Sequence, residues 1–268
     1  MSALWTATDI ARATDGVASA DFSANGVTFD SREVGPGDLF IALKGETTDG
    51  HRFVDGAFEQ GAAGAIVSQP VAHPNIRVAD TTAALDALGV AARARTAAKI
   101  AGVTGSVGKT GTKEALSAAL ARGKRGAVHR SVKSYNNHTG VPLSLSRMPA
   151  DSAFGVFEMG MNHAGELAAL TRLVRPHVAV VTTVAAAHIE YFGSVEAIAD
   201  AKGEIFQGLE PGGTAIVPFD NPHRDRLLGH ARPYATNILT FGSGEGADIR
   251  ALNALPTAAG TMVTASLP

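Results

Sequence analysis

The chain has 268 residues, of which 45% are hydrophobic and 18% charged, and its formal net charge is -2. Such a composition can bury a sizeable core and excludes an intrinsically disordered chain. Because the charges nearly balance, the sequence indicates neither a nucleic acid nor a membrane as a partner. The chain has no cysteine, so disulfides, thiolate metal sites and cysteine nucleophiles are excluded, and any metal must be bound by oxygen or nitrogen.

The sequence predicts no membrane-spanning or export segment. The N-terminus lacks a cationic stretch followed by an apolar one, because Asp9 and Arg12 interrupt it early. The best candidate for a spanning segment, residues 178–189, is shorter than the roughly 20 apolar residues that a bilayer needs. We expect a soluble, cytoplasmic protein that works as a monomer.

The length favours two modest domains over one large one. Residues 1–82 are rich in turns between short apolar runs, such as 39–43 and 65–67, which indicates a small α/β domain. An alanine-rich, helix-prone stretch follows over 83–98, and we place the boundary of the second domain, 83–268, at its start.

In the second domain, short apolar runs alternate with helical patterns. We predict strands over 100–103, 154–157, 178–181 and 214–217, and helices after Gly108, over 166–174 and over 195–209. This alternation is typical of an α/β domain with a mostly parallel sheet covered by helices. A hairpin with its turn at Gly260 is predicted over 257–268, and we expect this domain to be incomplete at its C-terminal end.

A glycine-rich loop follows the first of these strands. Residues 102–110 read Gly-Val-Thr-Gly-Ser-Val-Gly-Lys-Thr and precede a helical pattern. In such a context, backbone N–H groups converge on phosphate oxygens, Lys109 can reach the outer phosphates and Thr110 can ligate Mg²⁺. The glycines fall at 102 and 105, where the strict motif has one at 103, so the loop is a variant. We interpret it as an ATP-binding loop rather than as a plain glycine turn.

Lys202 lies at an inward position of the predicted helix over 195–209. It falls seven residues after Val195, which begins the apolar stripe. Burial of an unpaired ammonium is costly, and desolvation lowers its pKa toward that of a reactive neutral amine. Alternatively, the side chain reaches the surface, or pairs with Glu204 or Glu158. The spacing alone leaves these alternatives open.

Glu158 and His188 each follow an apolar run, so each is predicted near the carboxyl end of a strand, where open α/β sheets bind ligands. Together with Thr110 they could ligate nucleotide-bound Mg²⁺. A lone glutamate is otherwise usually a solvated loop residue, and a lone histidine usually a hydrogen-bonded structural one.

Three polar segments are weaker candidates. Asn137 stands in a polar cluster before an apolar helix pattern, where asparagine also serves as a helix cap. In the first domain, residues 30–32 and 49–53 offer hydroxyl, guanidinium and aromatic groups for a planar, phosphorylated ligand. Solvated turns would have the same composition.

Together these segments resemble the Mur ligase family of peptidoglycan synthesis over nearly the whole chain. Within the family, residues 135–137 and 158–166 resemble the members that add D-alanyl-D-alanine. The segments that carry the resemblance are 30–32, 36–45, 49–53, 104–110, 135–137, 140–142, 158–166, 187–190, 192–194 and 201–205.

The resemblance implies an ATP-dependent ligase that joins D-alanyl-D-alanine to UDP-N-acetylmuramoyl-tripeptide through an acyl phosphate. These two small molecules would be its substrates. The implied cofactors are ATP, two Mg²⁺ ions and a CO2-derived carbamate on Lys202. The implied catalytic residues are Lys109, Lys202, His188 and Asn137, and the implied metal ligands are Thr110, Glu158, His188 and the carbamate of Lys202.

The resemblance also assigns the two nucleotide sites. The ATP site would consist of Thr104, Gly105, Ser106, Val107, Gly108, Lys109, Thr110 and Asn221. The UDP-linked substrate would contact Ser31, Arg32, Lys44, Gly45, Asp49, Gly50, His51 and Phe53 in the first domain.

Two positions depart from the family's pattern, which usually has glutamate where His138 stands and asparagine where Pro218 stands. The family's third domain has no counterpart in these 268 residues, so we expect this chain alone to be inactive or weakly active. Two alternatives remain: a ligase with another acceptor, such as MurE or folylpolyglutamate synthase, or a nucleotide-binding module without turnover.

Overall fold

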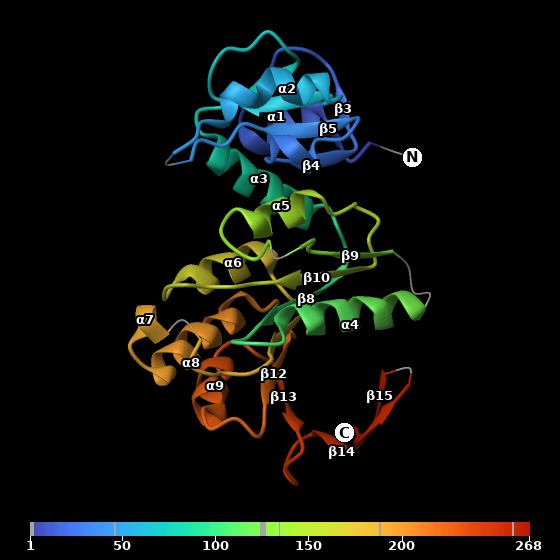
Figure 1. The fold of residues 1–268 in the computed structure, drawn as a ribbon, viewed down its shortest axis with the longest axis vertical. Coiled ribbons are helices and arrows are strands. Elements are labelled where there is room, and N and C mark those ends of the chain that lie inside the picture. Colours follow the sequence, from blue (N-terminus) through green and yellow to red (C-terminus); the bar gives the residue numbers. More distant parts are fainter. Residues whose placement is uncertain (1–2, 46, 124–126, 134, 188, 259) are drawn as a thin grey trace. The chain divides into compact units, whose positions relative to one another are not determined.

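The structure is a computed structural model that describes residues 3–45, 47–123, 127–133, 135–187, 189–258 and 260–268 (Figure 1). The chain forms two compact units. The first consists of Met1–Ala97 and Thr139–Ser152, and the second of Ala98–His138 and Ala153–Pro268. Within the described ranges, the helices are too short or too polar to span a bilayer.

The first unit is built on a five-stranded sheet in the order β2-β7-β6-β5-β4. Strands β4 to β7 run parallel to one another, β2 pairs antiparallel with β7, and β1 pairs with β3. Its strands are β1 (Trp5–Thr6), β2 (Val17–Ala18), β3 (Ser23–Ala24), β4 (Gly26–Thr28), β5 (Asp38–Ile41), β6 (Gly64–Val67) and β7 (Asn75–Arg77). Its helices are α1 (Ala7–Thr14), α2 (Val54–Glu59), α3 (Thr81–Ala94) and α5 (Gly140–Ser146), with short 3-10 helices η1 (Ser31–Glu33) and η2 (Gly50–Phe53).

Helix α3 belongs to this first unit, so the observed boundary differs from the one expected after residue 82. Asp80 caps the helix, because its carboxylate accepts hydrogen bonds from the N–H groups of Thr82 and Ala83. The apolar face of α3 is buried inside the unit. A Cβ atom on Gly89 would lie only 3.2 Å from Pro142 of α5, which shows how tightly the two helices pack.

The second unit is built on an eight-stranded sheet in the order β15-β14-β13-β12-β11-β8-β10-β9. All neighbouring strands are parallel except the hairpin of β14 and β15. The strands are β8 (Lys99–Thr104), β9 (Val128–Arg130), β10 (Phe154–Glu158), β11 (Val178–Val181), β12 (Thr214–Pro218), β13 (Asn237–Gly242), β14 (Ile249–Thr257) and β15 (Gly260–Ser266). The predicted mostly parallel α/β sheet is confirmed.

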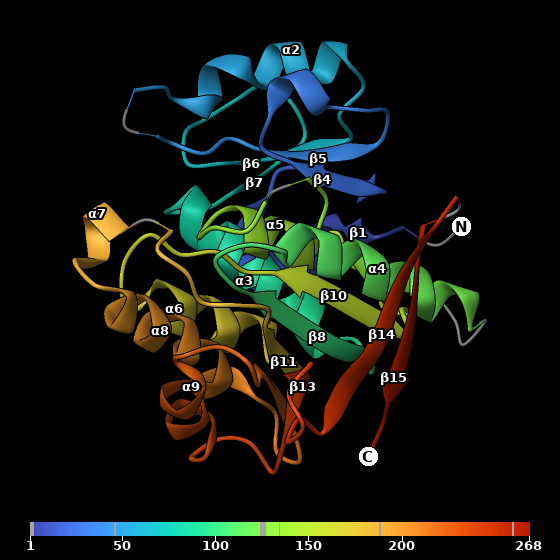
Figure 2. The same cartoon turned by 60° about the horizontal axis from the view of Figure 1, so that its bottom comes forward.

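Helix α4 (Lys109–Arg122) packs on β8, β9 and β10, while α6, α8 and α9 gather on the other side of the strands (Figure 2). Because β8, β10, β11 and β12 are parallel, the segments that follow them meet at one edge of the sheet. The remaining helices are α6 (Glu166–Val174), α7 (Ile189–Phe192), α8 (Val195–Gly203), η3 (Glu204–Gly208) and α9 (Arg224–Ala231).

Two predicted elements differ in extent. The helix expected over 195–209 ends as an α-helix at Gly203 and continues as the 3-10 helix η3. Here the Ile205 carbonyl accepts a hydrogen bond of 2.6 Å from the Thr171 hydroxyl of α6. This side chain takes the place of the backbone N–H that would bond this carbonyl in a continuing α-helix. The expected C-terminal hairpin is present, but its first strand already begins at Ile249.

Candidate nucleotide and metal site

The glycine-rich loop predicted from the sequence connects β8 to α4. Gly105 and Gly108 have positive φ angles of 150° and 85°, which L side chains rarely adopt. A Cβ atom on Gly105 would also collide with the hydroxyl of Thr182. Glycine at these positions therefore brings the loop backbone close to the segment that follows β11.

Residues after β11 hold this loop in place. The Thr182 hydroxyl donates a hydrogen bond of 2.6 Å to the Val107 carbonyl, and the Ser106 N–H donates one of 2.9 Å to the Thr183 carbonyl. Lys109, the first residue of α4, folds back so that its Nζ donates to the Gly105 carbonyl over 2.8 Å. The helix N-terminus and this ammonium make the loop electropositive, as phosphate binding requires.

Glu158 ends β10 beside the loop and is only 2% exposed. Its Oε2 accepts a hydrogen bond of 2.9 Å from the Thr110 hydroxyl, and its Oε1 accepts one of 2.8 Å from Asn136 Nδ2. The ammonium of Lys113 lies 3.8 Å from Oε2. Hydroxyl and carboxylate oxygens are ligands that Mg²⁺ prefers, so the Thr110 and Glu158 pair fits a hard cation.

The described residues provide only part of the expected set of metal ligands. His188 lies outside the described residues. Within the described part of the chain, no three histidine, aspartate or glutamate side chains gather as a metal-ligating group. A cation at Thr110 and Glu158 would therefore need further oxygen ligands, such as those of bound phosphate and water.

Lys202 of α8 is 4% exposed, so its predicted inward orientation is confirmed. Burial lowers the pKa of Lys202 to about 7, and the positive charge of Lys109 adds to the effect. Among the described carboxylates, none lies within 4.0 Å of its ammonium, including those of Glu204 and Glu158. The alternative that this lysine pairs with either glutamate is therefore wrong for the residues that the structure describes.

Asn221 follows β12 and is linked to the loop through the segment after β11. Its Nδ2 donates to the Thr183 hydroxyl over 3.2 Å and to the Val184 carbonyl over 2.9 Å. A cavity of about 220 Å³ adjoins it, lined by Thr183, Pro218, Asp220, Asn221, Pro222, Phe241 and Gly242. Backbone and side-chain hydrogen bonds from Ser243 lower the pKa of Asp220 and tie the chain around this cavity. The predicted ATP residue Asn221 thus lies next to the loop.

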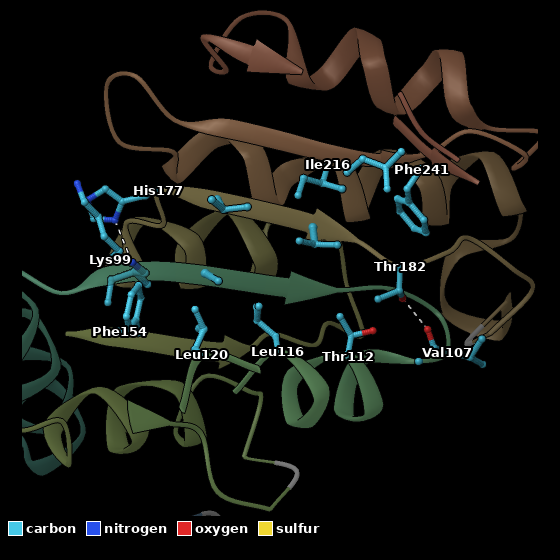
Figure 3. Close-up of a pocket in the computed structure, with 16 residues that line it drawn as sticks. Lys99, Val107, Thr112, Leu116, Leu120, Phe154, His177, Thr182, Ile216 and Phe241 are labelled. Atoms are coloured by element: carbon cyan, nitrogen blue, oxygen red, sulfur yellow. Dashed lines mark hydrogen bonds between the residues drawn. The ribbon is translucent and has the colours of Figure 1, made fainter. Parts of the chain in front are cut away.

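A larger cavity of about 720 Å³ lies between α4 and the strands β8, β11, β12 and β13 (Figure 3). Leu116 and Leu120 of α4 face Ile216 and Phe241 of the sheet across it, and Thr182 and Val107 lie at one end (Figure 3). Because its lining is mostly apolar, this cavity offers few groups that could hold a phosphate. The polar candidate site is instead at the sheet edge beside it.

The residues predicted to contact the UDP-linked substrate come from neighbouring loops of the first unit. Ser31 and Arg32 form η1 after β4, and the segment from Lys44 to Phe53 follows β5. Since β4 and β5 are adjacent and parallel, both loops lie at the same edge of that sheet. The Arg32 guanidinium is exposed and forms two hydrogen bonds with the Asp30 carboxylate, of 2.9 and 2.6 Å.

The second of these loops is fixed by a histidine. Asp49 caps η2 and hydrogen-bonds the His51 ring at Nδ1 over 2.5 Å, while the Ser68 N–H after β6 donates to Nε2 over 2.8 Å. These hydrogen bonds lower the pKa of Asp49. Gly50 allows the tight approach, since a Cβ atom there would lie 2.7 Å from the Leu43 carbonyl. The predicted residues Lys44, Gly45, Asp49, Gly50, His51 and Phe53 thus all lie in the segment after β5, and the hydrogen bonds of Asp49 and His51 hold its second half.

Sequence reasoning missed two residues of the second unit's site. Asn137, predicted to be catalytic, is exposed, and the asparagine that contacts Glu158 is its neighbour Asn136. Lys113, one helical turn after Lys109, is 1% exposed beside the same carboxylate. Lys113 lies four residues after Lys109 and three after Thr110, on the same helix face, and this spacing could have predicted its place in the site.

Comparison with known proteins identifies the family. The Mur ligase middle domain matches residues 103–267, and the catalytic domain of the Mur ligase family matches residues 23–124. The UDP-N-acetylmuramoyl-tripeptide--D-alanyl-D-alanine ligase of Escherichia coli K12 is 38% identical over 252 residues, which are 93% of this chain and 55% of that protein.

Solved structures agree with this result. A crystal structure of MurF from Acinetobacter baumannii has a TM-score of 0.86 at 33% identity and covers 98% of this chain and 58% of that one. MurF from Thermotoga maritima in complex with ADP has a TM-score of 0.73 at 31% identity, over 90% of this chain and 56% of that one. The chain spans about half the length of the curated relatives it matches. Because the middle-domain match alone covers more than half of its residues, the chain belongs to the Mur ligase family.

Proposed function

We propose that this chain carries the nucleotide and metal site of an ATP-dependent ligase that joins D-alanyl-D-alanine to UDP-N-acetylmuramoyl-tripeptide. We further propose that it acts as a monomer in the cytoplasm. The observation that carries the proposal is the assembly of Lys109, Thr110 and Glu158 at one sheet edge, with the hydroxyl and carboxylate 2.9 Å apart. Relatives that are 34–39% identical are named for this reaction, which supports the choice of acceptor.

In this proposal the loop from Gly105 to Gly108 binds the phosphates of ATP through its backbone N–H groups. Lys109 would exchange its hydrogen bond to the Gly105 carbonyl for one to a phosphate oxygen, which a flexible lysine can do without moving the helix. The cavity beside Asn221 would receive the adenine end. Catalysis would then rest on positioning and on neutralising the charge of the transferred phosphoryl group.

Thr110 and Glu158 would hold Mg²⁺, with His188 as a further ligand. When bound, the metal would shield the charge between the phosphates and the tripeptide carboxylate. The carboxylate of the tripeptide would take the γ-phosphoryl group, and the amine of D-alanyl-D-alanine would displace phosphate from the resulting acyl phosphate. Lys109 and the loop would orient the phosphates for both steps.

Lys202 would act as a carbamate in the functional enzyme. A lysine with a pKa of about 7 is largely a neutral amine at slightly alkaline pH, and only the neutral amine can add to CO2. The product is an anion, which removes the unfavourable burial of a cation next to Lys109. The carbamate would supply a second anionic group for the metals, and Asn137 would contact the reacting groups from its exposed turn.

The first unit would bind the uridine diphosphate end of the second substrate. The exposed guanidinium of Arg32 and the predicted residues between Lys44 and Phe53 would contact the phosphates and the planar base. In this assignment the first unit, Met1–Ala97 with Thr139–Ser152, contributes the substrate-binding domain that we expected over 1–82, and the second unit contributes the ATP-binding domain.

Calorimetry with this chain tests the proposal. UDP-N-acetylmuramoyl-tripeptide and Mg²⁺-ADP should both bind, and a folate should not. Arg32→Ala should weaken binding of the UDP-linked ligand by about tenfold, while ADP affinity stays within about twofold because distant sites are independent. Tight folate binding, or an Arg32→Ala effect confined to ADP, would contradict the assignment.

A further inference from the structure

Lys113 has an unusual environment for a lysine, because the side chain is fully buried in a helix that otherwise buries little. It is 1% exposed, and the other buried residue of α4 is Ser117. Its ammonium donates to the Lys133 carbonyl over 3.1 Å and lies 3.3 Å from Glu114 Oε1 and 3.8 Å from Glu158 Oε2. An ammonium is rarely buried to this extent unless its position serves several partners.

The position excludes direct phosphate binding. Lys109, one turn earlier on the same face of α4, already reaches the loop with its ammonium. The three partners of Lys113 instead come from α4 itself, from the end of β10 and from the segment between β9 and α5. Its ammonium therefore lies among oxygen atoms of the protein itself.

The segment between β9 and α5 depends on this lysine for part of its shape. Lys133 has a positive φ of 53°, which is strained for a residue with a side chain, and its carbonyl is the one that Lys113 holds. The same segment supplies Ser131, whose hydroxyl accepts the Glu158 N–H over 2.9 Å, and Asn136, which donates to Oε1. Lys113 thus forms an ion pair with Glu158 and also hydrogen-bonds a carbonyl close in sequence to the two residues, Ser131 and Asn136, that contact Glu158.

We propose that Lys113 is a positioning residue that orients the Glu158 carboxylate for nucleotide-bound Mg²⁺. This inference rests on the proposed function, because it takes Glu158 as a metal ligand. The lysine provides a buried counter-charge for the carboxylate. Among the residues that the structure describes, Oε2 then has only the Thr110 hydroxyl at hydrogen-bond distance. Residues that orient a metal ligand commonly change metal affinity when they are replaced, although they never touch the metal.

The test is the Mg²⁺ dependence of ADP binding by the whole chain. For each variant, calorimetry gives the Kd in excess EDTA and the Kd in excess Mg²⁺, and their ratio is the metal enhancement. Lys113→Gln keeps a donor for the Lys133 carbonyl and removes the charge. We expect the enhancement to fall by about tenfold, while the Kd in EDTA stays within about twofold of the wild-type value.

Glu114→Gln is the matched control, since it removes the exposed partner of the same ammonium. Its enhancement should stay within about twofold of the wild-type value, because exposed ion pairs contribute little. The inference would be overturned if folded Lys113→Gln showed the metal enhancement of the wild type. It would also be overturned if the variant lost equal ADP affinity in EDTA and in Mg²⁺. A wild-type chain that binds no ADP would instead contradict the proposed function.

If Lys113→Gln unfolds below the temperature of the binding assay, a measurement of Tm tests the inference instead. The single variant leaves the Glu158 carboxylate buried without its cation, whereas Lys113→Gln combined with Glu158→Gln leaves no buried charge. Lys113→Gln should have a lower Tm than the wild type. We expect the double variant to recover at least about half of that decrease in Tm, since contacting residues are energetically coupled. No regain would show that Lys113 does not act on Glu158.

Discussion

Two lysines of the second unit are almost equally buried, Lys113 in α4 at 1% exposure and Lys202 in α8 at 4%. Lys113 has a carbonyl and two carboxylates around its ammonium. Around Lys202, the described residues provide no carboxylate within ion-pairing distance, and the charge that acts on its pKa is the cation of Lys109. Burial alone therefore does not decide what a lysine does.

The partners decide its chemistry. Lys113 has three oxygen atoms around its ammonium, so it can act as a counter-charge and orient Glu158. Lys202 has its pKa lowered to about 7, first by burial and then by Lys109, so it can lose its proton near neutral pH and become a nucleophile. The predictions below test this contrast, from the largest expected effect to the smallest.

Replacing each of the two lysines by methionine should have a different effect on the free energy of unfolding. Lys113→Met should lower the free energy of unfolding by about 3 kcal/mol, because it leaves Glu158 buried without a cation. Lys202→Met at pH 6 should leave stability unchanged or raise it, because it removes a buried ammonium that has no carboxylate partner among the described residues. Urea unfolding of the two variants at pH 6 measures both effects. Equal losses would contradict the contrast.

Lys109 provides a third case, a half-buried lysine whose ammonium lies over the loop. Lys109→Ala should weaken Mg²⁺-ADP binding by about 10- to 100-fold, because a charged hydrogen-bond donor to phosphate is lost. Lys99→Ala, at the other end of β8 and exposed, is the matched control and should bind ADP as the wild type does. Fluorescence titration with a labelled nucleotide would measure both, and equal affinities would remove the loop from the proposed site.

The pH dependence of the free energy of unfolding should show whether the pKa of Lys202 is lowered in the folded chain. Between pH 7 and its ordinary pKa of 10.5, the unfolded chain binds this proton and the folded chain does not. Stability contributed by this residue therefore rises with pH in that window, by up to about 1.4 kcal/mol per pH unit. Below pH 7 both states are protonated and the cost of burying the charge is fully present.

The comparison is made in CO2-free buffer, with the wild type and Lys202→Met unfolded in urea at a series of pH values. The stability of the wild type relative to the variant should increase from pH 7 to pH 9. A difference that stays constant with pH would mean that Lys202 keeps its proton in the folded chain.

Local patterns in the sequence predicted the loop at the site correctly. The strand–loop–helix order around Gly105 to Thr110 and the place of Glu158 at a strand end follow from residue type and hydrophobic spacing. The same spacing predicted the inward direction of Lys202. It also predicted the parallel sheet, because strands and helices alternate regularly.

Other features depend on tertiary contacts that a pattern does not contain. In α4 the fully buried positions are Lys113 and Ser117, while Leu116 and Leu120 line the large cavity, so polarity does not mark the buried stripe. Asn136 and Asn137 are adjacent and identical in type, and only the tertiary fold shows that Asn136 contacts Glu158. The domain boundary likewise depends on the packing of α3 against α5.

The most direct test of the contrast is the reaction of the chain with ¹³C-labelled bicarbonate at pH 8, followed by ¹³C nuclear magnetic resonance. The proposed account predicts one carbamate carbonyl signal in the wild type and its loss in Lys202→Met. Glu114→Gln, which alters the surroundings of Lys113 and Arg130, should retain the signal. Absence of the signal in the wild type, or its persistence in Lys202→Met, would contradict the claim that Lys202, with its lowered pKa, is the reactive one of the two buried lysines.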